Sequence, residues 1–277
     1  MPDLLLYFST LACWLVLSGV AWRASRPALA GAPAPALGEL RLEIAVVPVA
    51  LVLHGMLLYR RMVVPEGLDL GVANAISMLA WLTILIYWLA SLAYPGLASI
   101  LGLTAPIGLG AVVLQIVIPT KHVVTYGADP LFTLHFAIAM LAYSLFFVAT
   151  VHALVMLAEE KWLHRGVLPP FIRSLPPLLE MEALLFRILL AAFVLLTLTV
   201  LSGVFFSEEL FGKPFTFTHK NVFAILSWFI FGGLLVGHHV RGWRGRTAVY
   251  WTLAGFTALM LAYVGSKAVL ELVLKRG

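Results

Sequence analysis

Apolar residues dominate this chain in long runs, and polar residues mark the gaps between them. A helix needs roughly 20 consecutive apolar residues to cross the hydrocarbon core of a bilayer, and several runs reach about this length. They predict helical spans at residues 4–22, 43–58, 70–91, 97–118, 129–157, 183–206, 220–239 and 247–270. The pattern therefore predicts an all-α fold, a polytopic transmembrane helical bundle of about eight spans.

The connections between the runs have compositions typical of loops and turns. Residues 23–38 are rich in Pro and Ala, and their prolines remove backbone donors and disfavour helix. Tyr94-Pro95-Gly96 is a turn signal, Pro106 predicts a kink, and residues 159–182 form the longest charged connection. No repeat and no linker to a soluble domain is visible, so residues 1–277 are expected to form a single transmembrane domain. The first run has no basic segment before it and no cleavage site, which favours a retained helix over a signal peptide.

Composition excludes most soluble classes of protein. Hydrophobic residues make up 62% of the chain and charged residues 11%, whereas soluble domains carry roughly 25% charged residues. The net charge of +5 comes from basic residues scattered between apolar runs, so no nucleic-acid partner is indicated. The single cysteine, Cys13, lies within the first run and cannot form an internal disulfide.

The distribution of Lys and Arg predicts the orientation of the bundle, because cytoplasmic loops carry an excess of these residues. With the N-terminus outside, the inner loops hold nine basic residues: Arg23, Arg26, Arg41, Lys161, Arg165, Arg173, Arg241, Arg244 and Arg246. The outer loops and the C-terminus hold fewer. The sequence therefore predicts a multi-pass protein of the bacterial inner membrane, with the lipid bilayer as its first partner and both termini periplasmic.

The polar residues within the spans are mainly histidines, and acidic residues lie at span ends or in loops. The histidines in or at the ends of spans are His54, His135, His152, His219, His238 and His239. Polar side chains are costly in hydrocarbon and commonly mark function. Hard cations need oxygen ligands, whereas imidazole suits borderline metals and haem iron. The pattern favours a haem or soft-metal site over a cation pathway.

Two histidines on different helices could supply the two axial ligands of a haem iron, and His54 and His238 are the candidates. The predicted spans place His54 in the outer half of the membrane and His238 near the inner face, so the pair would need helix tilt to meet. The alternative is that each imidazole hydrogen-bonds a neighbouring helix. His135 could be an interfacial residue, His152 a core residue, and His219 a loop or cap residue.

Other motifs point to no soluble chemistry. The chain has no GxxxxGK[ST] loop, no GxSxG elbow and no HExxH helix. The segment 241–246 reads Arg-Gly-Trp-Arg-Gly-Arg, and its arginines and its tryptophan suit a topology anchor at the membrane interface. A role in binding phosphate or propionate is an alternative for this segment.

Several segments together resemble a known family. They are His54, His135 with Tyr143, Leu175-Pro176-Pro177-Leu178, Leu195-Leu196-Thr197-Leu198-Thr199, Phe223-Ala224-Ile225-Leu226-Ser227-Trp228, His238 with Gly242-Trp243-Arg244-Gly245, and Ala262-Tyr263-Val264-Gly265. The chain resembles the cytochrome c assembly family of CcsA type, integral membrane proteins that handle haem. It looks most like the short YpjD- and HemX-like branch of that family.

The resemblance implies haem b as cofactor and haem traffic as function. His54 and His238 match the transmembrane histidines of the family, with His239 as the alternative to His238, and His135 matches the first external histidine. The loop 207–220 contains no tryptophan, where the full synthases of the family have a Trp-rich motif, and no histidine follows Gly265. The chain is therefore expected to bind or handle haem without being a complete haem lyase.

Two other function classes are alternatives. The first is a cofactor-free accessory or regulatory membrane protein, which would act through residues 159–182 and 241–246 on a metal-transport or haem-synthesis partner. Its partner could equally be a cytochrome c maturation protein or another membrane protein. The second is a small-molecule transporter, which the lack of intramembrane carboxylates and of repeats argues against.

Overall fold

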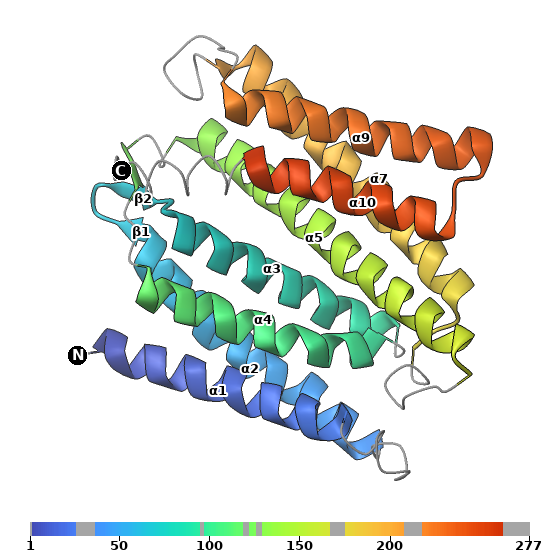
Figure 1. Cartoon of the computed structure of the whole chain (residues 1–277). Helices are drawn as coiled ribbons and strands as arrows, with labels where there is room; N and C mark the ends of the chain where they lie inside the picture. The colour runs from blue at the N-terminus through green and yellow to red at the C-terminus, as the bar shows by residue number, and fades with distance from the viewer. Residues whose placement is uncertain are drawn as a thin grey trace.

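The computed structural model is a bundle of long helices with one very small sheet (Figure 1). It describes residues 2–25, 37–94, 97–118, 122–125, 129–166, 175–207 and 218–262. The described helices are α1 (Pro2–Ser25), α2 (Leu37–Met62), α3 (Val72–Ala93), α4 (Ala98–Val117), α5 (Pro130–His164), α7 (Leu178–Phe205), α9 (His219–Arg241) and α10 (Gly245–Met260). The strands are β1 (Val63–Val64), β2 (Gly67–Asp69) and β3 (Val123–Val124).

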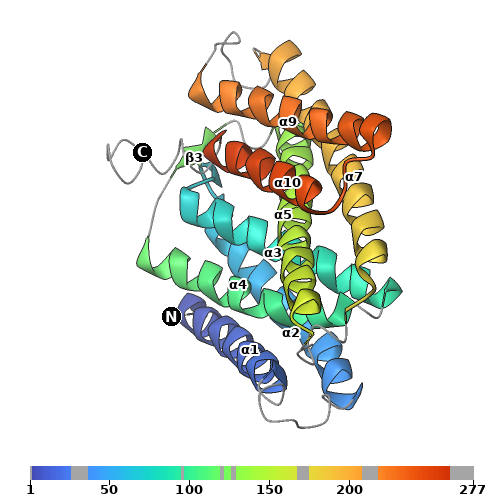
Figure 2. The same ribbon diagram turned by 45° about the vertical axis from the view of Figure 1, so that its right-hand side comes forward.

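The helices pack as two groups of four. In the amino-terminal half, α1 packs on α2 and α4, and α3 packs on α2 and α4. In the carboxy-terminal half, α5 packs on α7 and α10, and α9 packs on α7 and α10. The interface between α3 and α5 joins the halves, and α2 and α9 lie on opposite sides of the bundle in both views (Figures 1 and 2).

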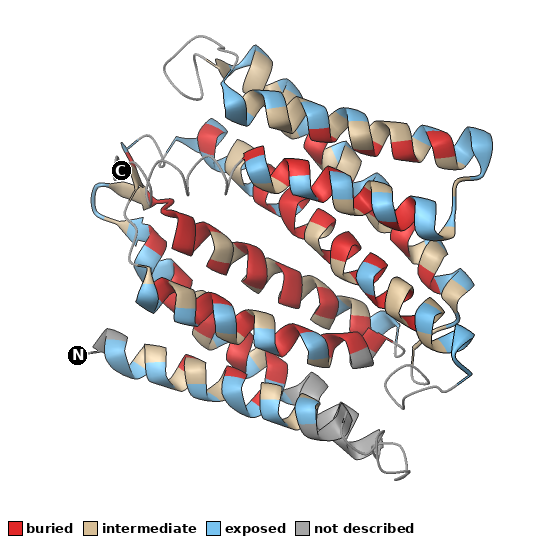
Figure 3. Ribbon diagram, in the orientation of Figure 1, coloured by how far each residue is buried: buried red, intermediate tan, exposed pale blue. Residues whose placement is uncertain are grey.

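Burial matches a bundle that faces lipid. Buried residues concentrate on α3 and α5 at the centre, whereas outer faces carry exposed residues (Figure 3). Many exposed side chains are large and apolar, among them Leu5 of α1, Phe205 of α7 and Val240 of α9. A water-soluble surface does not expose this much apolar area, so the outer faces are lipid-facing and the chain is a multi-pass membrane protein.

The predicted all-α bundle is confirmed, and the eight described helices correspond to the eight predicted spans. Six of them, α1, α3, α4, α5, α7 and α9, are long and apolar enough to cross a membrane. The other two described helices, α2 and α10, are not among these six but pack within the two groups of four. The fifth and sixth spans are longer than predicted, because α5 continues to His164 and α7 begins at Leu178. Most of the predicted charged connection at 159–182 is therefore helical where it is described.

Helix direction gives the bundle two distinct ends. The sheet end carries β1, β2 and β3, and α1 begins and α10 ends there (Figure 1). The arginine end carries the turn 241–246 between α9 and α10, together with the end of α5 and the start of α7.

The sheet was not predicted from the sequence. Strand β2 pairs antiparallel with β1 and with β3, in the register Val63 with Leu68 and Asp69 with Val123. The carboxylate oxygen Oδ1 of Asp69 accepts the N–H groups of Gly71 at 3.0 Å and His122 at 2.8 Å. This buried carboxylate therefore ties the start of α3 to the segment that follows α4.

Some sequence predictions lie outside the described residues. These are most of the Pro- and Ala-rich loop, the tryptophan-free loop between α7 and α9 apart from its ends, and the aromatic-glycine segment after Ala262. The predicted end of the last span at residue 270 also lies outside them.

Candidate functional site

His54 lies in the interior of the amino-terminal half, on α2, with no solvent exposure. Its Nε2 atom is 2.8 Å from the hydroxyl of Ser77 on α3. Its Nδ1 atom is buried and has no hydrogen-bond partner in the described structure. The ring also contacts Trp14 of α1 edge-on, with ring centroids 6.0 Å apart and planes at 78°. His54 is thus a buried imidazole with one nitrogen unbonded.

Close packing between α2 and α3 fixes the position of this histidine. Gly55 lets the two helices approach, since a Cβ there would lie 3.3 Å from the ring of Trp81. The indole N–H of Trp81 donates to the carbonyl of Leu51 at 2.7 Å. Ser77 bonds the His54 ring and Trp81 bonds the backbone of α2, so these two residues of α3 join it to α2 by hydrogen bonds in this region.

His238 lies near the end of α9, at the arginine end, and is partly buried. Its ring stacks on Phe186 of α7, with centroids 3.5 Å apart and planes at 16°. Its Nδ1 atom is 2.8 Å from the carbonyl oxygen of Trp243. Because a carbonyl oxygen only accepts, Nδ1 carries the proton, and the neutral ring has its lone pair on Nε2. No described residue hydrogen-bonds Nε2.

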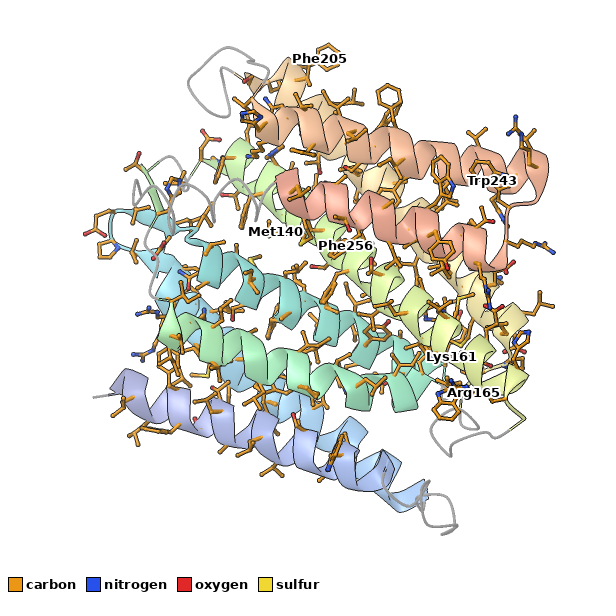
Figure 4. The ribbon with its side chains drawn as sticks, in the orientation of Figure 1. Met140, Lys161, Arg165, Phe205, Trp243 and Phe256 are labelled. Atoms are coloured by element: carbon orange, nitrogen blue, oxygen red, sulfur yellow. The ribbon has the colours of Figure 1, made fainter. Side chains whose placement is uncertain are left out.

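The turn after α9 brings the carbonyl of Trp243 to Nδ1 of His238. Gly242 adopts a left-handed conformation with φ 65° and ends the helix, and its N–H donates to the carbonyl of His238 at 3.1 Å. The chain then folds back, so the ring of Trp243 covers Gly237, where a Cβ would overlap it. Trp243 also packs on Trp251 of α10 at 4.9 Å between ring centroids. Figure 4 shows Trp243 beside the turn between α9 and α10.

Two ion pairs hold the same turn against neighbouring helices. The carboxylate of Glu182 accepts the N–H of Gly245 at 3.0 Å and lies 3.3 Å from Nε of Arg244. Arg246 pairs with Glu160 of α5 at 3.1 Å. Glu182 of α7 and Glu160 of α5 therefore contact the turn 241–246, while the side chains of Arg244 and Arg246 stay mostly exposed.

His239 follows His238 in the chain but has a different environment. It is exposed, whereas His238 is partly buried between α9 and α7. Consecutive helical residues point about 100° apart, so only one of two neighbouring side chains faces the bundle. The geometry therefore favours His238 over His239 as the residue that faces the interior.

His135 lies two turns into α5, at the sheet end, and is partly buried. Its Nδ1 atom is 2.8 Å from the hydroxyl of Ser202 on α7. That hydroxyl donates its hydrogen to the carbonyls of Leu198 at 2.7 Å and Thr199 at 3.1 Å. Ser202 therefore links the ring of His135 to the backbone of α7.

The four predicted histidines do not form one cluster. His54 contacts α1 and α3, whereas His135 and His238 contact α7 near its two ends. Their α7 partners, Ser202 and Phe186, are 16 residues apart, which is about 24 Å along a helix. No group of three or more His, Cys, Asp or Glu suited to a metal ion occurs in the described part of the chain.

Two other histidines lie elsewhere in the bundle. His152 is fully buried and joins two helices, because its Nε2 donates to the carbonyl of Met181 at 2.9 Å; its Nδ1, like that of His54, has no hydrogen-bond partner in the described structure. His219 is the first residue of α9 and is exposed. Its side chain sits beside the cap residue Thr218, whose side chain accepts from the N–H of Asn221.

The structure adds residues that sequence reasoning missed. Trp14 and Ser77 contact His54, Trp81 packs beside the neighbouring Gly55, and Phe186 and Ser202 hold the other two rings. The sequence placed each of them on a span but gave no sign of which helix face it occupies. Small residues beside aromatic ones, as at Gly55 and Gly237, were the available signal of close approach between helices.

The matched family accounts for most of these helices. The chain belongs to the family of cytochrome c assembly proteins, whose model matches residues 44–274. The match includes His54, His135 and His238. It leaves out the residues before 44, which contain the whole of α1 and the start of α2.

Individual relatives extend this assignment. The chain is similar to the inner membrane protein YpjD of Escherichia coli K12, with 29% identity over 239 residues, or 85% of this chain and 89% of that one. It is similar to an uncharacterized 28.8 kDa protein of Azospirillum brasilense, 31% identical over 51% of this chain and 52% of that one. The cytochrome c biogenesis protein CcsA of Prochlorococcus marinus MIT 9515 is 31% identical over 31% of this chain and 28% of its own. No solved structure matches the chain.

Proposed function

We propose that this protein binds and handles haem in the bacterial inner membrane and does not attach haem to cytochrome c by itself. The observation that carries the proposal is the state of His238. A ligating histidine generally donates its second ring N–H to a carbonyl or carboxylate, which fixes the tautomer and the ring orientation. His238 has this arrangement, with Nδ1–H on the carbonyl of Trp243 and the lone pair on Nε2.

The chemistry of the other histidines fits the same group. His54 has a buried Nδ1 without a partner, and a buried polar atom left unpaired costs about 1–3 kcal/mol. That cost is removed when the nitrogen gains a ligand. Imidazole nitrogen is a standard axial ligand of haem iron, so the residues present suit haem b, which when bound supplies an iron with two axial positions.

The arrangement suggests separate roles for the histidines. His238 would hold haem at the arginine end of the carboxy-terminal half, with Phe186 keeping its ring in plane. His54 would act in the amino-terminal half, since its neighbours come from α1 and α3. His135 would act at the sheet end, oriented by Ser202. In this proposal each of the two transmembrane histidines would meet haem at its own position, because His54 contacts α1 and α3 whereas His238 contacts α7.

The proposed orientation places the arginine end in the cytoplasm and both termini in the periplasm. Arg244 and Arg246 lie in the turn at that end, and Lys161 and Arg165 lie at the end of α5 (Figure 4). Cytoplasmic loops carry such an excess of basic residues. The loop 207–220 lacks the tryptophans of the full synthases, which supports a role short of complete cytochrome c synthesis.

The test is a haem titration of the purified protein in detergent, followed by its Soret band. Wild-type protein should show a saturable band with a stoichiometric end point. His238→Ala should abolish or strongly weaken the Soret component of the haem bound at His238, and His54→Ala should reduce the stoichiometry. His164→Ala is the matched control, because His164 is an exposed histidine at the end of α5. The proposal would be rejected if the wild-type protein showed no saturable band, or if the bands of all four proteins were equal.

A second candidate function rests on the turn at the arginine end. Glu182 and Glu160 contact this turn, and its arginine side chains are mostly exposed, which suits recognition by a membrane partner such as a metal-transport or haem-synthesis protein. A cofactor-free accessory protein of this kind would lose activity in cells when Arg244 and Arg246 are both replaced by Gln. The histidine variants would then stay active.

A further inference from the structure

Helix α1 lies outside the region matched by the family and yet contributes a residue to the surroundings of His54. Its outward face carries the exposed Phe8, Leu15 and Val16. Among its described residues, Thr10, Trp14 and Leu17 are buried, and Leu6, Tyr7, Leu11 and Cys13 pack partly buried against the core. The spacing of four and three places the buried residues in a stripe along one face of the helix, flanked by the partly buried ones.

Trp14 is the centre of that stripe. It is fully buried, and its ring lies so close to α4 that a Cβ at Gly108 would be 2.9 Å from it. On its other side it meets His54 edge-on. The indole N–H has no hydrogen-bond partner in the described structure, as Nδ1 of His54 has none. The two rings of this contact therefore each carry a buried nitrogen without a hydrogen-bond partner in the described structure.

The groups around His54 differ in how firmly they are held. Ser77 is hydrogen-bonded to the imidazole, and Trp81 is hydrogen-bonded to the carbonyl of Leu51. Trp14 is held by apolar packing without a hydrogen bond from its indole N–H. Displacing Trp14 therefore breaks no indole hydrogen bond, and in a membrane its apolar contacts can be replaced by contacts with lipid tails. Of these three side chains, Trp14 is the one whose displacement breaks no side-chain hydrogen bond.

We propose that α1 is part of the His54 site and that Trp14 is a positioning residue that covers the imidazole in the ligand-free protein. Haem reaches His54 only when the indole withdraws from the ring. This inference rests on the proposed function, since it assumes that His54 receives haem. It adds α1, which the family match omits, to the site, and it assigns to α1 control over the rate at which haem reaches His54.

The experiment measures the rate of haem uptake by the apoprotein in detergent, by stopped-flow absorbance. Trp14→Ala should raise the His54-dependent rate constant about tenfold, with the final spectrum unchanged. Phe8→Ala is the control, because Phe8 is a large aromatic residue on the lipid-facing side of the same helix, and its rate should equal that of wild type. Trp14→Phe keeps an aromatic wall and loses only an unbonded N–H, so its rate should stay within twofold of wild type.

A double-mutant cycle separates gating from general loosening of the fold. In a His54→Ala background, Trp14→Ala should leave the remaining uptake rate unchanged. Coupling of this kind is the evidence for a direct effect between two sites. Equal acceleration with and without His54 would mean that Trp14→Ala only loosens the bundle, and the inference would be wrong.

Hydrogen exchange of the wild-type protein provides a measurement that depends on no variant. Amides of α1 around Trp14 should exchange faster in the haem-loaded protein than in the apoprotein. If wild type takes up no haem, the proposed function fails and this inference falls with it. If uptake depends on His54 but is insensitive to Trp14→Ala, and α1 exchange is unchanged, the proposed function stands and this inference alone fails.

Discussion

Gly237→Ala is the substitution that most directly perturbs the His238 arrangement without touching the histidine. A Cβ at this position overlaps the ring of Trp243, so the ring and its backbone must move. The carbonyl of Trp243 is the acceptor for Nδ1 of His238 at 2.8 Å, and the same movement therefore weakens the bond that fixes the tautomer.

The magnitude follows from three terms. Overpacking a fitted position costs about 1–3 kcal/mol, and a lost hydrogen bond costs about 0.5–1.5 kcal/mol. Replacing a helical Gly by Ala returns about 1 kcal/mol. The net expectation is a destabilisation of about 0.5–3.5 kcal/mol, together with weaker haem binding, because the ring of His238 loses its orientation.

The assay is thermal unfolding in detergent with and without haem, beside the haem titration. Gly110→Ala is the matched control, since a Cβ at Gly110 meets nothing within 4 Å; it should be neutral or slightly stabilising. If Gly237→Ala unfolds at the same temperature as Gly110→Ala and binds haem as wild type does, the role given to the Trp243 carbonyl is wrong.

Three further substitutions test other contacts. Trp81→Phe removes the 2.7 Å bond to the Leu51 carbonyl and should cost about 1 kcal/mol by thermal unfolding, whereas Phe8→Ala on the lipid face should cost less. Asp69→Ala removes the acceptor of two N–H groups; it should cost about 2–4 kcal/mol and raise hydrogen exchange at Gly71 and His122, and unchanged exchange there would count against the tie described. Glu182→Gln leaves an oxygen for the Gly245 N–H and weakens the pair with the mostly exposed Arg244; it should change stability by less than about 1 kcal/mol, and a larger loss would show that the turn depends on this ion pair.

The sequence predicted the helices well because a helix that crosses a bilayer must be long and apolar, and both properties can be read from the sequence. The ends of α5 and α7 were misplaced, since Glu159, Lys161 and Glu182 look like loop residues but lie within helices that continue past the apolar run. The three-stranded sheet was missed because strands of two or three residues are too short to carry a periodicity.

The candidate site was only partly predictable. The histidines were visible because imidazole is unusual within apolar spans, and the family that they suggested is confirmed. Their partners were not visible, because contacts such as Trp14 with His54 and Phe186 with His238 depend on how each helix is rotated about its axis. The ligand roles of His54, His135, His238 and His239 stay predictions. The sequence did not show that His54 and His238, the candidate pair of haem ligands, lie in different halves of the bundle.

The most direct test of haem handling compares the Soret spectra of His238→Ala and His239→Ala proteins after identical haem loading. The two residues are adjacent, and only His238 stacks on Phe186 and donates to the carbonyl of Trp243. The His238→Ala protein should lose the Soret component of the haem bound at His238, and the His239→Ala protein should keep it at the wild-type amplitude. Loss of the component in His239→Ala alone, or in neither protein, would contradict the assignment of His238 as the haem ligand.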